Sequence, residues 1–207
     1  MKDAPDHSAG SDPAWADINT RIAARVRSLR AERGLTLAAL AARSEVSRSM
    51  ISLIERGESS PTAVVLEKVA TGLGVSLAAL FDNPDAAANP VSRHADRAAW
   101  RDPESGYVRR NISPANFPSP IQIVEVELPA GARVAYETGV RDANIFQQIW
   151  VQQGGIDVTV GGVIHRLSKN DCLAMQLNEP VAFHNRSRRS ARYIVVLAAD
   201  HARHPRR

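Results

Sequence analysis

The sequence predicts an α+β protein of two domains, with five helices first and an all-β domain after them. From about Ala16 to Phe81, apolar residues recur at helical spacing. From about Tyr107, short apolar runs alternate with glycine, proline and asparagine turns, which is typical of strands. Because the helices precede all the strands, we expect two separate units and not a βαβ fold. The predicted divisions are a disordered arm (1–15), a helical domain (16–82), a linker (83–106), a β domain (107–200) and a basic tail (201–207).

Composition narrows the class of protein. The 207 residues carry a formal net charge of +4, and the sequence pI is about 9.7, which weakly favours a polyanionic partner. The single cysteine, Cys172, cannot form an internal disulfide and fits a reducing compartment. Its apolar strand context predicts a small buried side chain and not a redox sensor. We found no signal-peptide pattern and no apolar stretch long enough to span a membrane, so we expect a cytoplasmic protein.

Capping residues place the five helices. Ile18, Ile22, Val26 and Leu29 form the inner stripe of the first helix, and Gly34 ends it. Thr36 is predicted to cap the second helix and Ser47 the third, which Gly57 terminates. Ser60-Pro61 has the pattern of an N-cap followed by a first-turn proline, which predicts the start of the fourth helix, and Ser76 is predicted to cap the fifth.

The third predicted helix has two distinct sides. Ile51 and Ile54 lie on one side and are predicted to anchor it on the core, which leaves Arg48, Ser49, Ser52 and Leu53 on the outer side. A short helix with small polar residues and an arginine in its first turn is suited to enter the DNA major groove N-terminus first. There, Arg48 would reach a guanine edge and Leu53 a thymine methyl group. The amides at the start of the second helix, near Leu37, would hold a phosphate.

Residues Arg21–Phe81 resemble the lambda-repressor-like helix-turn-helix domains of the XRE family. The segments VSRSMISLIERG and SSPT, followed by VATGLGVS, carry the resemblance over the whole five-helix unit. It implies a DNA-binding regulator in which an arginine of the first helix, here Arg30, pairs with a late glutamate of the third, here Glu55. The alternative for this pair is two unrelated solvated charges. The predicted DNA-contacting residues are Leu37, Ser47, Arg48, Ser49, Ser52, Leu53, Arg43 and Arg27. The alternative for the arginines among them is an ordinary solvated surface.

The turn before the third helix departs from the family pattern. Members usually have glycine at this position, whereas this chain has Glu45. If the site has a positive φ, the glutamate adds strain of about 1 kcal/mol.

The β domain resembles the compact cupin domain, a double-stranded β-helix or jelly roll, over about Pro118–Ala199. The resemblance rests on the Pro-Ala-Gly turn, the GGIDVTV strand, the Asn-Asp turn and the late His-Asn-Arg-Ser loop. Gly161-Gly162 between two valines predicts a hairpin. The predicted strands are Ile121–Leu128, Ile145–Val151, Ile156–Val160, Cys172–Leu177 and Tyr193–Leu197.

The metal ligands that many cupins share have no counterparts here. The resemblance places the glutamate position on Gln147, the third histidine on Val181 and the first two within Glu137–Ala143, which contains no histidine. His184 is predicted to point to the opposite face from Val181. We therefore expect no metal and no cofactor. The barrel interior would then be a closed core or an effector pocket, with the candidates Tyr136, Gln147, Ile149, Met175, Val181 and Phe183. Glu137, Arg141 and Asp142 would lie in the loop over the barrel mouth.

Together these features predict a homodimeric regulator, not an enzyme, that binds double-stranded DNA at a palindromic operator. Its cupin domain would dimerise or sense a small effector. The alternatives are a cupin dioxygenase or isomerase, which bound stoichiometric metal would indicate, and an antitoxin or scaffold that binds protein.

Overall fold

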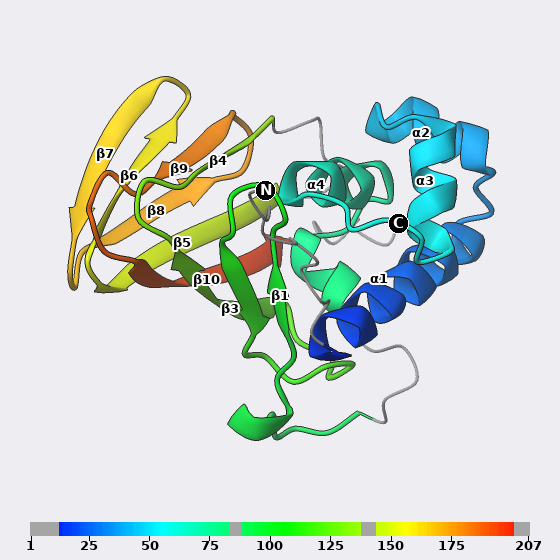
Figure 1. Ribbon diagram of the computed structural model, residues 1–207, viewed down its shortest axis with the longest axis horizontal. Helices are drawn as coiled ribbons and strands as arrows, with labels where there is room; N and C mark the ends of the chain where they lie inside the picture. The colour runs from blue at the N-terminus through cyan, green and yellow to red at the C-terminus, as the bar shows by residue number, and fades with distance from the viewer. Residues whose placement is uncertain (1–12, 83–87, 138–143, 201–207) are drawn as a thin grey trace, which may run out of the picture.

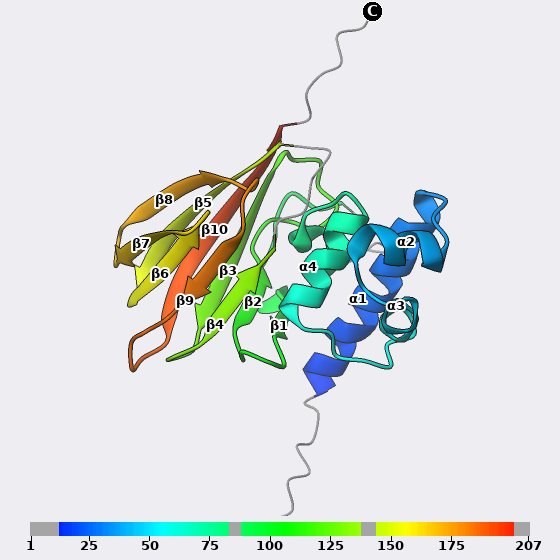
Figure 2. The ribbon, with the colours of Figure 1, turned by 90° about the horizontal axis from the view of Figure 1, so that it is seen from above.

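The computed structural model describes residues 13–82, 88–137 and 144–200. Figures 1 and 2 show helices on one side and a two-sheet barrel on the other, with α2 and α3 farthest from the barrel and α4 between. The helical side consists of α1 (Pro13–Glu32), α2 (Leu37–Ser44), α3 (Arg48–Glu55), α4 (Ala63–Gly72) and the 3-10 helix η1 (Leu77–Phe81). Within the described residues, no helix is long and apolar enough to cross a membrane.

The predicted apolar stripe of α1 and the predicted caps Thr36, Ser47 and Ser76 are confirmed. Ile18, Ile22, Val26 and Leu29 are all buried. Thr36, Ser47 and Ser76 each accept a hydrogen bond from a first-turn amide through the side-chain oxygen. These bonds satisfy amides that a helix start otherwise leaves without an acceptor.

Three boundaries differ from the sequence prediction. Helix α1 starts at Pro13, inside the stretch predicted to be an arm, because proline is favoured at the first helical position. Helix α4 starts at Ala63 and not after Ser60, because Thr62 is the extended residue whose side chain caps it. The fifth segment is a 3-10 helix of five residues, so the described residues contain four α-helices.

The strands form a jelly roll. One sheet has the order β1-β2-β3-β10-β5-β8 and the other β4-β9-β6-β7. From β3 onward the chain passes repeatedly between the sheets, as in the double-sheet fold that cupins adopt. The bounds are β1 (Ala99–Arg101), β2 (Val108–Asn111), β3 (Ile121–Leu128), β4 (Arg133–Tyr136), β5 (Asn144–Gln153), β6 (Gly155–Val160), β7 (Val163–Ser168), β8 (Cys172–Gln176), β9 (Val181–His184) and β10 (Ala191–Asp200).

The hairpin predicted at Gly161-Gly162 is confirmed. Val160 of β6 pairs with Val163 of β7. Both glycines have positive φ, 53° and 90°, as a two-residue turn between antiparallel strands requires.

Much of the predicted linker is structured. It contains a short 3-10 helix, η2 (His94–Asp96), and strand β1, which pairs with β2 at the edge of the large sheet. Trp100 of β1 is 2% exposed because its ring packs between Phe81, at 5.5 Å, and Tyr107, at 5.8 Å, measured between centroids. Asp102, also buried, accepts a hydrogen bond from the Ala63 amide of α4 at 2.7 Å.

These contacts join the two predicted domains through one continuous apolar cluster. Asn111 donates to the Ala78 carbonyl oxygen at 2.9 Å, and Lys68 of α4 lies 3.2 Å from the Glu137 carboxylate. The helical side therefore packs directly on the barrel, a contact that the sequence analysis did not predict. The apolar surface that each part would expose alone favours this packing.

The prediction that Cys172 is buried was wrong, because this side chain is exposed. It lies on β8, an edge strand of the large sheet, where Leu173 and Met175 pack against the core. Since successive residues of a strand face opposite sides, Cys172 points outward.

Candidate nucleic-acid interface and ligand cavity

Helix α3 is fixed to the core by one side. Ile51 is 0% and Ile54 2% exposed, so both isoleucines anchor the helix as the spacing predicts. Ser47 Oγ accepts a hydrogen bond from the Met50 amide at 3.2 Å and so caps the start of the helix.

The opposite side of α3 is open. Ser47, Arg48 and Ser49 are exposed, and Ser52 and Leu53 are half-buried. The Ser47 and Ser49 hydroxyl oxygens lie 3.1 Å apart. The structure thus leaves these five predicted residues accessible on α3, a helix that lies on the side of the molecule away from the barrel (Figure 2).

Arg56 belongs beside this face, although the sequence analysis did not select it. Its Nη1 donates to Ser52 Oγ at 2.5 Å, and its Nη2 to Glu58 at 2.8 Å. This pair raises the pKa of Arg56 and lowers that of Glu58. The sequence could have indicated Arg56 as a candidate DNA contact, because this arginine directly follows α3.

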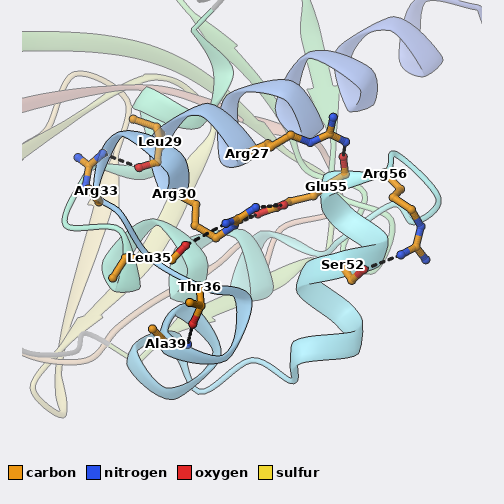
Figure 3. A network of polar contacts seen from close by, with 10 residues as sticks. All are labelled: Arg27, Leu29, Arg30, Arg33, Leu35, Thr36, Ala39, Ser52, Glu55 and Arg56. Atoms are coloured by element: carbon orange, nitrogen blue, oxygen red, sulfur yellow. Dashed lines mark hydrogen bonds and ion pairs between the residues drawn. The ribbon is translucent and has the colours of Figure 1, made fainter.

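A buried ion pair sets the position of α3 relative to α1 (Figure 3). Arg30 Nε and Nη2 donate to the two Glu55 carboxylate oxygens at 2.6 and 2.8 Å. The Glu55 side chain is 7% exposed. The Arg30 Nη1 donates to the Leu35 carbonyl oxygen at 2.9 Å, so one guanidinium ties α1, the following turn and α3 together. The hydrogen bond to Glu55 raises the pKa of Arg30.

The remaining predicted DNA contacts lie on α1 and α2. Arg27 is exposed at its side chain but donates to the Glu55 carbonyl oxygen, so its guanidinium also caps the end of α3. Leu37 is half-buried at the first position of α2, where helix geometry leaves amides without an intrahelical acceptor. Arg43 is exposed in the last turn of α2.

The turn between α2 and α3 has a positive φ at Glu45, the position where members of the family usually have glycine. Glu45 has φ 54° and ψ 25°, the left-handed region, and is the C-cap of α2. The tight turn therefore forms with a glutamate, at a conformational cost that glycine would avoid.

A cavity of about 70 Å³ lies where the helical side meets the barrel. Four of the predicted pocket residues line it: Tyr136, Gln147, Val181 and Phe183. Ile149 and Met175 do not, because Ile149 is completely buried in the packed core and Met175 packs against that core. Arg141 and Asp142 lie outside the described residues.

The cavity has polar residues that the sequence analysis missed. Arg109 of β2, Tyr107, Tyr193 and Glu67 of α4 all line it. Tyr136 donates its hydroxyl to the Tyr107 hydroxyl oxygen at 3.2 Å. Burial raises the pKa of all three tyrosines, which keeps the phenols neutral at ordinary pH.

The expected metal positions can be located in part. Gln147 and Val181 face the cavity. His184 follows Phe183 on β9 and so faces the opposite side of the strand, where Arg186 Nε lies 3.4 Å from His184 Nδ1. No group of three or more His, Cys, Asp or Glu side chains within residues 13–82, 88–137 and 144–200 is arranged to hold a metal ion. Residues 138–143, most of the loop assigned to the first two histidines, fall outside that description.

Comparisons with known proteins agree with this architecture. The helix-turn-helix family HTH_3 matches residues 26–80. The chain is 28% identical over 137 residues to the HTH-type transcriptional regulator SutR of Escherichia coli, covering 66% of this chain and 71% of SutR. It is 38% identical over 60 residues to the uncharacterized HTH-type transcriptional regulator y4dJ of Sinorhizobium fredii, covering 29% of this chain and 78% of that protein.

One solved structure matches both parts of the fold. It is an HTH_3 family transcriptional regulator from Vibrio cholerae, with a TM-score of 0.71 and 26% identity over 88% of this chain and 97% of that one. The helix-turn-helix geometry, the jelly-roll topology and these similarities lead to one conclusion. The chain belongs to the XRE family of DNA-binding helix-turn-helix transcriptional regulators and carries a C-terminal domain of the cupin fold.

Proposed function

We propose that this regulator is a homodimer that recognises a palindromic operator through α3 and responds to a small effector held in the cavity. Each α3 enters the major groove of one half-site, and the two half-sites are centred one DNA turn, roughly 34–36 Å, apart. The barrels hold the two helical domains at this spacing.

The observation that carries the proposal is the free outer side of α3. Arg48 is exposed in its first turn, next to the small side chains of Ser47 and Ser49. Small residues let the backbone approach the groove, and an arginine donates two parallel hydrogen bonds to a guanine edge. Ser52 and Leu53 follow one turn later and contact the next bases. Leu37, Arg43 and Arg27 supply further contacts, to phosphates beside the groove.

The outer surface of the large sheet supports pairing of two copies. Phe146 and Trp150 of β5 are each 48% exposed, although aromatic side chains of this size are usually covered. In the strand pairing, Cys172 and Ile194 flank Trp150, whereas Ala198 and Gln176 flank Phe146, and the exposed Gln148 lies between the two aromatic residues. An exposed, aromatic-containing patch of this kind is typical of a homodimer interface.

DNA recognition is tested by selecting bound fragments from a random duplex pool, then measuring affinity for the enriched site. We expect one symmetric site, strong weakening with added salt, and a loss of about 1–3 kcal/mol for Arg48→Ala on that site. Arg166→Ala, which removes an exposed arginine from β7 in the barrel, is the matched control and should bind like wild type. Enrichment of no sequence by the wild-type protein would refute the proposal.

Dimerisation is tested by light scattering of Trp150→Glu, which should be monomeric, with Ile164→Glu as the control. Ile164 is also about half exposed, at 50%, but lies on the other sheet. The single cysteine gives an independent measurement, because alkylation of Cys172 should slow as the protein associates. A dimeric Trp150→Glu variant with unchanged Cys172 reactivity would rule out this face.

A further inference from the structure

The cavity lies at the junction of the two parts of the protein. Glu67, Ser76 and Leu77 form its helical wall, and β2, β3, β4, β5, β9 and β10 supply the barrel wall. One water molecule needs a cavity of about 10–15 Å³, measured as the space open to the centre of a water-sized sphere. By the same measure this cavity has about 70 Å³, which accommodates a small organic molecule.

Arg109 is the unusual group in this cavity. Its residue is 7% exposed, and its Nε and Nη2 have no hydrogen-bond partner among the residues that the structure describes. One face of the guanidinium lies over the Phe81 ring, 5.3 Å from the centroid, which partly compensates the charge, and Tyr107 is hydrogen-bonded to the Arg109 side chain, but Nε and Nη2 remain unpaired. A buried cation with unpaired donors is costly, so such a group favours an anionic ligand.

The carboxylates nearby do not fill this role. Asp102 accepts from Ala63 and Ser105. Glu67 lines the same cavity and has an interaction of its own, but it makes no hydrogen bond to Nε or Nη2 of Arg109. Burial raises the pKa of Asp82. The charges of Arg25, Arg21 and Arg109 all act to lower it, so Asp82 is shared among three arginines and is not the partner of Arg109 alone.

Strand register explains why Arg109 and not its neighbour faces inward. Arg109 pairs with Val126, which lines the cavity, whereas Arg110 pairs with Glu125 and lies 3.8 Å from its carboxylate. Two adjacent arginines therefore have different roles, and Arg110 supplies a matched control.

The other walls define the rest of the ligand. The hydroxyls of Tyr107, Tyr136 and Tyr193 and the amide of Gln147 supply polar contacts at a few points. The remaining lining is apolar: Leu77, Val126, Val134, Leu177, Val181, Phe183, Val195 and Leu197. This combination suits a short apolar body with one anionic end.

We propose that the cavity binds a small organic carboxylate whose two oxygens accept hydrogen bonds from Nε and Nη2 of Arg109. A planar guanidinium matches a carboxylate in this bidentate geometry. The inference deepens the effector role in the proposed function and rests on it for its regulatory meaning. Because the cavity wall includes α4 and η1, the bound carboxylate bridges the barrel and the DNA-binding part of the chain.

The test uses butyrate and its neutral analogue butyramide on the full-length protein. Titrations are followed by the NMR signal of the Arg109 Nε–H group, which is assigned by its loss in Arg109→Met, with chloride matched in concentration. We expect butyrate to shift this signal saturably and butyramide to leave it unchanged. If both molecules shifted the signal, or if neither did, the inference would be overturned. This measurement is made on the wild-type protein, so it does not depend on whether a variant folds.

Variants add a second measurement, the affinity for butyrate by calorimetry. Arg109→Met should weaken butyrate binding by at least about 30-fold, the effect of removing one partner from a buried charge pair. Arg110→Met should bind butyrate like wild type, and equal weakening by the two variants would contradict the assignment. DNA affinity is measured on the same samples: operator binding without butyrate binding refutes this inference alone, and butyrate binding without operator recognition refutes the regulator proposal alone.

Discussion

Replacing Glu55 by alanine removes one partner from the ion pair that fixes α3. The Glu55 side chain is 7% exposed and that of Arg30 19%, and two hydrogen bonds at 2.6 and 2.8 Å join them. Breaking a fully buried pair in this way costs about 3–5 kcal/mol, because the remaining charge loses its partner. Arg30 keeps its bond to the Leu35 carbonyl and some contact with water, so we expect a loss of about 2–3 kcal/mol.

The measurement is urea unfolding followed by circular dichroism, with operator affinity measured where every variant is folded. Glu58→Ala is the control, because Glu58 forms an exposed pair with Arg56 and its loss should leave the unfolding midpoint unchanged. A double-mutant cycle with Arg30→Met isolates the energy of the pair. Operator affinity should fall as well, since α3 loses its link to α1. Equal midpoints for Glu55→Ala and Glu58→Ala would refute the argument that this pair holds the recognition helix.

Three further substitutions test other parts of the structure by the same unfolding assay. Glu45→Gly should stabilise the protein by about 1 kcal/mol, because Glu45 has a positive φ that glycine adopts without strain; a destabilised variant would contradict this. Gly72→Ala should destabilise by about 1–3 kcal/mol, since its Cβ would lie 2.8 Å from the Ser44 Cβ and 3.0 Å from its backbone nitrogen, and an unchanged midpoint would show that α2 and α4 separate freely. Asp102→Ala should cost about 1–3 kcal/mol because it leaves the buried Ala63 amide without an acceptor, with a smaller loss for Asp102→Asn, and equal losses would locate the effect elsewhere.

Local signals in the sequence determined the helical side and one hairpin. Ser47 caps α3 because its hydroxyl reaches an amide of the next turn, a contact within one short segment. The isoleucines of α3 face inward because helical periodicity alone places them together. Gly161 and Gly162 set the β6–β7 turn because few other residues adopt positive φ readily. Each of these features depends on residues a few positions apart, so the sequence reveals them directly.

Strand pairing and packing between distant segments decided the rest. Arg109 and Arg110 are chemically identical neighbours, and only the register with β3 turns the first into the cavity. Asp102 resembles any linker aspartate until the fold brings it against the start of α4. Cys172 has the sequence context of a buried strand residue, yet the edge position of β8 leaves it exposed. The cavity itself arises where the helical side packs on the barrel, and contacts between segments so far apart in the chain leave no local pattern in the sequence.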